Sequence, residues 1–316
     1  MNHNDIVVSI SCITYNHAPY IRQCLDGFMM QKTNFAFEVL IHDDASTDGT
    51  TEIIKEYEAK YPEIIKPLYE EENQWVKGRR GSAVFNYPRA KGKYIALCEG
   101  DDYWTDPLKL QKQVDFLEAN PKYGICYTKT RTYIQSSNDY GKIFGGPYTD
   151  LENMLNVNSI PTLTVVARKD LIFRYIEEIN PIARNWAMGD YPMWLWFAHE
   201  SKIKFVNEVT GVYRILQNSA SHNMDFREKE KFVHSVFSIK QFFMEKYNLC
   251  NVVDMRSNLY NSLMTNAMMY GHYTEAISYY KQIGRKSIKS RLKYFMCKYP
   301  ILMFICKKVL RNNGSI

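Results

Sequence analysis

The sequence predicts an α/β fold with a mostly parallel sheet, followed by a C-terminal helical extension. Short apolar runs rich in β-branched residues alternate with amphipathic stretches through roughly the first 120 residues, and this alternation implies right-handed crossovers between parallel strands. From Asp225 onward the strand signals vanish and helical spacing takes over. A chain of 316 residues also reaches the usual limit of one core, which favours one α/β unit with an appended region.

The hydrophobic pattern gives the order of the elements. Residues 6–13 form an apolar run that predicts the first strand, and the amphipathic stretch to Met30 predicts the first helix. Asp106-Pro107 is a favoured N-cap and first residue for a helix. The same reasoning predicts strands at 35–41, 64–69, 94–98, 124–133 and 162–167, helices at 50–61 and 79–91, and a polar, Gly-rich loop at 136–147.

The C-terminal region predicts helices and ends in a basic tail. Two short helices are expected in residues 258–281, around Gly271-His272, and residues 285–311 contain nine Lys or Arg and no Asp or Glu. Because the total net charge is +6, the rest of the chain is mildly acidic, which argues against a nucleic-acid partner. Apolar residues recur in this tail at steps of four and three: Ile288, Leu292, Phe295, Tyr299, Leu302, Cys306 and Val309.

An apolar helical stripe among basic residues suits the anionic surface of a bilayer. The alternative is a helix that docks on the acidic body of the same chain. Pro300 is expected to kink or split the helix. The sequence shows no secretory signal and no apolar run long enough to span a membrane. Seven scattered cysteines without CxxC spacing indicate a reduced, cytoplasmic protein without a zinc site.

The most informative segment is the acidic cluster after the apolar run at residues 94–98. Glu99, Asp101 and Asp102 follow this run directly, and parallel strands present functional residues at their carboxyl ends. Crowded carboxylates repel one another, and a hard divalent cation that also binds phosphate relieves that repulsion. The cluster therefore predicts a metal and phosphate site, whereas the simpler alternative is an acidic surface turn.

Two further strand ends carry polar clusters, at Thr14 to His17 and at Asp43 to Asp48. Their carboxyl ends should meet at one edge of the sheet, which predicts a single site. Farther along, Asp190 is surrounded in sequence by Met188, Trp194 and Phe197. A partly desolvated carboxylate of this kind is a candidate base, although it also fits the N-cap of the following helix.

Five strings, in order and spacing, resemble family 2 glycosyltransferases of the GT-A fold. They are TYNH at 14–17, DDASTDGT at 43–50, AKGKYIALCEGDDYW at 90–104, GDYPMWLW at 189–196 and YRILQNSASH at 213–222. The resemblance covers about residues 5–222 and implies a Rossmann-like sheet. It also implies an inverting enzyme that transfers a sugar from a nucleotide-diphosphate donor to an acceptor.

The resemblance implies a role for each matching residue. Thr14 and Tyr15, with Asn16 beside them, would line the nucleotide base, Asp44 would bind the base ring and Asp43 would support that loop. Asp190 matches the base that takes the proton from the acceptor hydroxyl. The DxD position is occupied by Glu99, Gly100 and Asp101, and Mn²⁺ or Mg²⁺ would be held by Asp101 with Asp102. The loop that closes over the diphosphate is represented by Arg214, Ser219, Ser221 and His222.

The chain departs from the family pattern at two places. Glu99 stands where Asp is commoner, which leaves its ribose or metal contact open. The family often has Arg-Asn some residues before AKG, whereas Ala83-Val84 stand there in this chain. Arg79, Arg80 and Asn86 are the candidate substitutes, and the spacing does not choose between them.

The expected function is transfer from a nucleotide sugar, most readily a UDP-sugar, to a glycan acceptor, lipid-linked in the surface-polysaccharide enzymes that the chain resembles. The expected organisation is a catalytic domain at 1–222, a helical extension at 223–284 and a basic tail at 285–316. The tail is expected to hold the protein on the inner face of the cytoplasmic membrane. Two alternatives are a nucleotidyltransferase, which should carry a Gly-rich phosphate loop after the first strand, and a catalytically inactive sugar-nucleotide-binding scaffold. A glycosidase is disfavoured because no second flanking carboxyl is identified.

Overall fold

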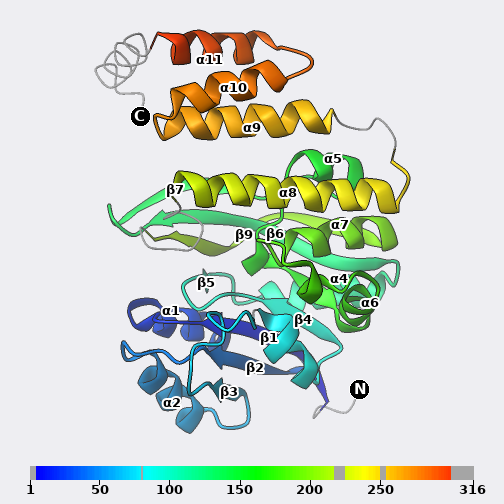
Figure 1. Ribbon diagram of the computed structural model, residues 1–316. Coiled ribbons are helices and arrows are strands. Elements are labelled where there is room, and N and C mark those ends of the chain that lie inside the picture. The colour runs from blue at the N-terminus through cyan, green and yellow to red at the C-terminus, as the bar shows by residue number, and fades with distance from the viewer. Residues whose placement is uncertain (1–4, 80, 217–224, 250–253, 300–316) are drawn as a thin grey trace. The chain divides into compact units, whose positions relative to one another are not determined.

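The computed structural model describes residues 5–79, 81–216, 225–249 and 254–299 (Figure 1). The chain divides into two compact units. The first comprises residues 1–185 and 189–219, and the second comprises residues 186–188 and 220–316. The first unit contains the sheet that the sequence predicts, and the second contains helices.

In the described part of the first unit, nine strands form one sheet. Its amino-terminal half is parallel, in the order β3-β2-β1-β4, and its other half is mixed. There, β8 pairs antiparallel with β4 and β6, while β9 runs parallel to β6 and antiparallel to β5. The strands are β1 (Ile6–Thr14), β2 (Ala36–Asp43), β3 (Ile65–Tyr69), β4 (Tyr94–Leu97), β5 (Tyr103–Trp104), β6 (Tyr123–Ile134), β7 (Asp139–Phe144), β8 (Val166–Arg168) and β9 (Lys202–Ile215).

The helices of the first unit connect these strands and cover the sheet. The predicted first and second helices are confirmed, with bounds within a residue or two of those expected from the sequence. The helices are α1 (Ala18–Met29), α2 (Thr50–Lys60), α3 (Ser82–Phe85), α4 (Lys109–Ala119), α5 (Leu151–Asn156), α6 (Lys169–Ile179) and α7 (Tyr191–Glu200), with short 3₁₀ turns at Tyr87–Arg89, Thr162–Thr164 and Pro181–Arg184.

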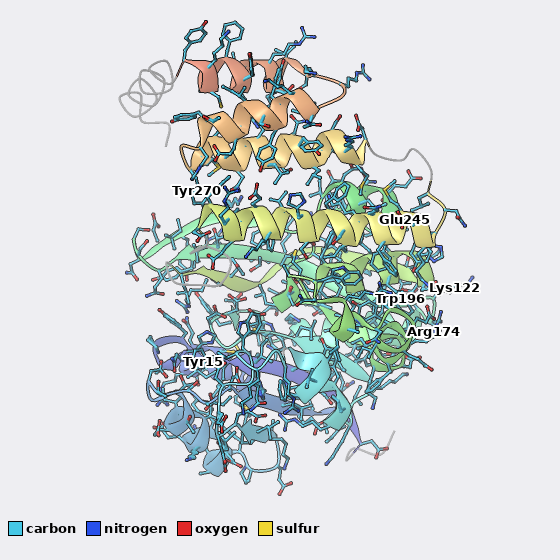
Figure 2. All side chains as sticks on the ribbon, in the orientation of Figure 1. Tyr15, Lys122, Arg174, Trp196, Glu245 and Tyr270 are labelled. Carbon is cyan, nitrogen blue, oxygen red and sulfur yellow. The ribbon has the colours of Figure 1, made fainter. Side chains whose placement is uncertain are left out.

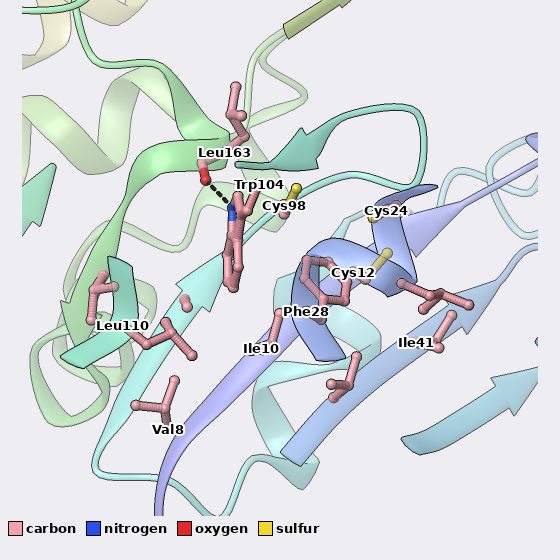
Figure 3. Close-up of a cluster of buried hydrophobic side chains, with 14 of the residues drawn as sticks. Val8, Ile10, Cys12, Cys24, Phe28, Ile41, Cys98, Trp104, Leu110 and Leu163 are labelled. Carbon is pink, nitrogen blue, oxygen red and sulfur yellow. Dashed lines mark hydrogen bonds between the residues drawn. The ribbon is translucent and has the colours of Figure 1, made fainter. Parts of the chain in front are cut away.

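The core of this unit lies where α1 and α4 pack on the parallel strands (Figure 3). Trp104 is fully buried, and its ring meets that of Phe28 edge to face at a centroid distance of 4.8 Å. Its indole N–H donates to the carbonyl oxygen of Leu163 at 2.7 Å, which satisfies its polar atom inside the core. Five cysteines of the described residues are buried and unpaired, as the sequence predicts: Cys12, Cys24, Cys98, Cys126 and Cys297.

Several element predictions need correction. The expected helix at 79–91 is only α3 and a 3₁₀ turn, because Pro88 has no N–H to continue a helix. The expected loop at 136–147 contains β7, whose hairpin turns at Asn138 with φ 55°. The helix expected at Asp106 begins at Lys109, and the Asp106 carboxylate accepts from the N–H of Leu108 instead. Likewise, the strand expected at 162–167 begins only at Val166.

Lys109, on α4, is buried beside the core tryptophan. Its Nζ donates to Oε1 of Gln113 at 2.8 Å and lies 4.2 Å from the centroid of the Trp104 ring. Desolvation lowers the pKa of Lys109 to about 7, whereas an exposed lysine titrates near ~10.4. Between these two values the unfolded chain binds the additional proton, so Lys109 makes the folded state less stable as the pH falls from about 10 to about 7.

We therefore expect Lys109→Met to raise the melting temperature at pH 7 by about 3 °C or more, partly offset by the lost bond to Gln113. The gain should shrink as the pH rises toward 10, because the lysine of the unfolded chain then also begins to lose its proton. Thermal melts at pH 7, 8 and 9 measure this, with the exposed Lys122→Met as control (Figure 2). A gain that is the same at all three values would contradict the explanation.

The second unit is helical, as predicted. Its elements are α8 (Phe226–Lys246), α9 (Met255–Met269), α10 (Tyr273–Gln282) and α11 (Ile288–Lys298). A capping box between Asp225 and Glu228 opens α8. Phe226, Met264, Ala267, Ala276 and Cys297 belong to its buried core.

One face of α11 packs on the other helices and another is exposed. Tyr294 stacks on Tyr280 at a centroid distance of 4.4 Å, and Ser290 and Cys297 are buried. The exposed large apolar residues are the first four of the predicted stripe, Ile288, Leu292, Phe295 and Tyr299. Leu302, Cys306 and Val309 lie outside the described residues. In the part of the chain that the structure describes, none of the helices is both long and apolar enough to cross a bilayer.

Candidate active site

Three strand ends meet at one edge of the parallel sheet, as the sequence predicts. Thr14 at the end of β1 is the register partner of Asp43 at the end of β2, and β4 lies on the other side of β1. Asn16 has a left-handed backbone, with φ 53°. Its Oδ1 accepts from the N–H of Thr47 at 2.8 Å, and its own N–H donates to Oγ of Ser46 at 2.9 Å. Asn16 therefore ties the two loops together.

The residues expected at the nucleotide base lie on these two loops. Tyr15 is 46% exposed at the end of β1 (Figure 2). Asp43 accepts from Ser46 and Thr51, which supports its loop. Asp44 is buried.

The carboxylate of Asp44 is bound by a neighbouring loop. Its two oxygens accept from the backbone N–H groups of Gln74, at 2.6 Å, and of Trp75, at 3.2 Å. Only the remaining lone pairs of Asp44 are left for a base.

Gly100 allows the acidic loop to pack on β1. Its N–H donates to the carbonyl oxygen of Ile13 at 3.0 Å. A Cβ atom at this position would lie 2.6 Å from Oγ1 of Thr14 and 3.0 Å from Nδ1 of His17. Both of these buried atoms have no hydrogen-bond partner among the described residues. Any side chain at position 100 would therefore displace the acidic loop from the strand end.

The three acids of this loop differ in their surroundings. Oδ1 of Asp101 is buried and has no hydrogen-bond partner among the described residues. Asp102 is buried, and its Oδ1 accepts from the backbone N–H of Arg214 at 2.8 Å. Desolvation, together with the Asp101 carboxylate, raises the pKa of Asp102. Glu99 keeps an exposed side chain, yet the surrounding protein desolvates its carboxylate and raises its pKa to about 8, with Asp101 and Asp190 adding repulsion.

Asp101 and Asp102 differ in how far their carboxylates are engaged by the protein. A buried, unpartnered carboxylate oxygen beside other acids is a ligand without a partner. Oδ1 of Asp102 instead anchors the backbone of β9, so the expectation that Asp102 also ligates the metal stays a prediction that depends on its other oxygen. In the described ranges, no three His, Cys, Asp or Glu side chains are grouped as a metal site. Mg²⁺-type sites commonly combine one or two carboxylates with phosphate oxygens of the substrate.

Asp190 lies at the start of α7, where it makes the helix-end contact that was one of its two expected roles; its role as a base stays a prediction. Its Oδ1 accepts from the N–H of Tyr191 at 2.7 Å, which is a contact at the helix end. Its Oδ2 accepts from Oγ1 of Thr162 at 2.6 Å. Repulsion from Asp190 contributes, after burial and Asp101, to the raised pKa of Glu99. The helix contact therefore fixes a carboxylate beside the acidic loop.

Arg214 was expected to bind the diphosphate, but its guanidinium is engaged by other groups of the chain. Its guanidinium donates to the carbonyl oxygen of Asp101 at 2.8 Å and to the side-chain oxygens of Gln135 and Gln23, at 2.6 and 2.7 Å. The rings of Tyr20, Tyr103 and Tyr133 surround it, and it is buried. Arg214 therefore holds the Asp101–Asp102 turn in place from β9.

The candidates for the missing Arg-Asn pair separate clearly. Asn86 is fully buried and donates to Ser11 and to the carbonyl oxygens of Cys12 and Leu40, so it joins strands and faces no ligand. Arg79 is exposed, donates to Gln74 at 3.1 Å and lies over the Phe85 ring. Arg80 and the loop residues Ser219, Ser221 and His222 lie outside the described residues.

Two residues of this edge are given no individual role by the sequence. His17 contacts Gly100, and burial lowers its pKa, which leaves it neutral near pH 7. Its place in the first strand-end cluster was the available signal. Thr162 binds Asp190, and no local pattern distinguishes it from other threonines.

A parallel sheet with a cluster of acids at its carboxyl edge defines a class of α/β proteins that bind a nucleotide there. Comparison with known proteins narrows this class. The family model described as "Glycosyl transferase family 2" matches residues 9–168, about half of the chain. The protein belongs to glycosyl transferase family 2.

Individual relatives agree with this assignment. An uncharacterized protein of Mycobacterium tuberculosis is 35% identical over 225 residues, which is 71% of this chain and 63% of that protein, so this chain spans less than two thirds of its length. WfaP of Escherichia coli, a UDP-Glc:alpha-D-GlcNAc-diphosphoundecaprenol beta-1,3-glucosyltransferase, is 28% identical over 69% of this chain and 80% of its own.

A solved structure supports the predicted GT-A fold. The mannosyltransferase PcManGT of Pyrobaculum calidifontis, in complex with GDP-Man and Mn²⁺, superposes with a TM-score of 0.57 over 93% of this chain and 84% of that chain. The sequences are 17% identical, so this likeness concerns the fold.

Proposed function

We propose that the protein is an inverting glycosyltransferase that moves a sugar from a nucleotide-diphosphate donor, a UDP-sugar, to a hydroxyl of a glycan acceptor. The observation that carries this proposal is the unpartnered Asp101 oxygen at the carboxyl edge of the sheet, with the Asp190 carboxylate nearby. Family membership supports the same reaction. The catalytic domain would comprise residues 1–222, with residues 223–284 as a helical extension.

The proposed reaction divides the work between the two carboxylates. Breaking the bond from the sugar to the diphosphate builds negative charge on the leaving phosphate and positive charge at the anomeric carbon. When bound at Asp101, Mn²⁺ or Mg²⁺ would neutralise charge on the diphosphate. Asp190 would take the proton from the acceptor hydroxyl as that oxygen attacks the anomeric carbon from the opposite side. Attack from the opposite side inverts the centre and needs a single base.

The remaining residues of the edge would bind and position the donor. Thr14, Tyr15 and Asn16 would line the base together with the loop of Asp43 and Asp44. Glu99 and Gly100 would lie beside the ribose. Of the two arginines proposed for the diphosphate, Arg79 and Arg80, the structure describes Arg79, whose side chain is exposed. Arg214 would act through Asp101, whose carbonyl oxygen it binds.

One relative, WfaP, favours a UDP-sugar donor and a lipid-linked acceptor. The name of WfaP specifies both of these for that enzyme, and the PcManGT complex contains Mn²⁺. By analogy, we propose a lipid-linked acceptor in cell-surface polysaccharide synthesis. The test is incubation of the purified protein with UDP-Glc, UDP-GlcNAc or GDP-Man and MnCl₂, with melting temperature and nucleotide release as readouts.

The proposed function predicts that one donor raises the melting temperature and slowly releases its nucleoside diphosphate. A nucleotidyltransferase would instead release pyrophosphate from UTP and a sugar phosphate. A binding scaffold would be stabilised by the donor without any release. Either of these results would replace the proposal.

We also propose that α11 attaches the protein to the inner face of the cytoplasmic membrane. Ile288 and Phe295 are 87% and 57% exposed, and Lys289, Arg291 and Lys298 lie on the same short helix. Insertion of apolar side chains and attraction of basic residues to anionic lipids act together at a bilayer surface. This position would bring the enzyme to a lipid-linked acceptor.

Phe295→Glu should weaken binding to anionic vesicles by about tenfold or more, because burial of one large apolar side chain contributes about 1.5–3 kcal/mol. Ile182→Glu is the matched control, since Ile182 is 55% exposed on the other unit. Co-sedimentation with phosphatidylglycerol and phosphatidylcholine vesicles, at low and high salt, measures the effect. Equal pelleting of wild type and Phe295→Glu on anionic vesicles would rule out this attachment.

A further inference from the structure

A cavity of about 570 Å³ lies on the first unit, apart from the acidic loop. Its wall is formed by the end of β7 and the loop after it, by the segment that follows α5, and by the middle of β6 and the first half of β9. The side chains with the chemistry to hold a ligand there are Lys129, Phe144, Tyr148, Asn158, Phe205 and Asn207. The volume falls within the range of ligand sites, which is about 300–1,000 Å³.

The wall of this cavity is held by specific packing. Gly146 has φ 66°, and a Cβ atom there would lie 2.3 Å from the Phe205 ring. The N–H of Gly146 donates to the carbonyl oxygen of Ser159 at 3.2 Å. The hydroxyl of Tyr127 donates to the carbonyl oxygen of Tyr148 at 2.7 Å. The backbone of Gly146 thus packs directly on the Phe205 ring, and a larger residue at position 146 would displace this wall of the cavity.

The lining has the chemistry of a carbohydrate site. Phe144, Tyr148 and Phe205 line the cavity and bring apolar ring surface to it, which suits the apolar C–H groups of a sugar. The amides of Asn158 and Asn207 can donate to and accept from hydroxyl groups. Among the described residues of the lining, Lys129 alone is charged, so the lining favours a neutral or anionic sugar over a cationic one. A lining without acids also argues against a second metal–diphosphate site.

The cavity is connected to Asp190 by a short segment. Ser159 lines the cavity, and Thr162, three residues later, donates to the Asp190 carboxylate. Three residues span at most about 10 Å. A glycan held in the cavity can therefore reach the proposed base with a neighbouring sugar unit.

We propose that this cavity binds a sugar unit of the acceptor glycan and so selects which hydroxyl reaches Asp190. The proposal rests on the proposed glycosyltransferase function. The donor would stay at the sheet edge, and the cavity would bind the acceptor at a distance from the transferred sugar. Specificity for the acceptor would then depend on Asn158 and Asn207, and replacing either residue would leave the affinity for the donor unchanged.

The experiment measures sugar binding without turnover. Saturation-transfer NMR with p-nitrophenyl glycosides of glucose, galactose, N-acetylglucosamine and glucuronic acid, using p-nitrophenol as the blank, reports binding to the full-length protein. At least one glycoside should bind, and Asn158→Ala and Asn207→Ala should each weaken it about fivefold through loss of one hydrogen bond. Asn156→Ala, an exposed asparagine outside the lining, should leave binding unchanged.

Parallel calorimetry with UDP and Mn²⁺ separates this proposal from the proposed function. UDP affinity should be the same in all three variants. If UDP binds but no glycoside does, or if the cavity variants bind glycosides as well as wild type does, the acceptor site is overturned and the donor site stands. If the wild-type protein does not bind UDP in the presence of Mn²⁺, the proposed function is overturned instead.

Discussion

Asp190→Asn is expected to lower the turnover of sugar transfer by roughly 10²-fold or more, with donor affinity within about threefold of wild type. The amide has the shape of the carboxylate but cannot take a proton from an acceptor hydroxyl. Asn also serves well at helix N-termini, so it can still accept from the N–H of Tyr191. The folded structure should therefore survive while the proposed base is lost.

The assay compares initial rates at saturating donor and acceptor, together with donor affinity and melting temperature. Asp170→Asn is the matched control, because Asp170 is an exposed acid in the first turn of α6. If Asp190→Asn keeps near-normal transfer but melts well below wild type, Asp190 serves only as a helix cap. Normal transfer with a normal melting temperature would leave another group to act as the base.

The sequence predicts the parallel half of the fold and the meeting of its strand ends because those features are local. The apolar run at residues 94–98 and the acids after it lie within one short stretch of sequence. Because parallel strands have their carboxyl ends at the same edge of a sheet, the position of these acids beside the other strand ends can be predicted. The hairpin of β7 escapes prediction because Gly141, Gly145 and Gly146 give its segment the composition of a loop. Its strand conformation depends on pairing with β6, which sequence alone does not reveal.

Roles that depend on distant partners are also beyond the sequence. Arg214 has the residue type of a phosphate ligand, but Gln23 and Gln135 saturate much of its guanidinium from elements far away in the chain. Asp102 is one residue from Asp101 and has the same charge, yet Oδ1 of Asp102 accepts from the N–H of Arg214, whereas the buried Oδ1 of Asp101 has no partner among the described residues. Adjacent carboxylates on a turn point in different directions, and tertiary contacts decide which one remains available.

This difference between neighbouring acids sets the expectation for the second large effect. Asp101→Ala should weaken binding of UDP in the presence of Mn²⁺ by an order of magnitude or more, because a carboxylate ligand of the cation that bridges to the phosphates is lost. The backbone carbonyl of residue 101 remains, so its bond from Arg214 can persist and the turn should keep its fold.

Calorimetric titration with UDP, in Mn²⁺ and in excess chelator, measures the effect. Asp115→Ala removes an exposed carboxylate from α4 and controls for the change in net charge. Wild type and Asp115→Ala should both lose affinity when the chelator is added, whereas Asp101→Ala, already weak, should change little. Equal UDP affinity of the wild type with and without chelator would remove the metal from the proposed mechanism. The unpartnered oxygen of Asp101 would then face the donor without a cation, and its negative charge would repel the diphosphate.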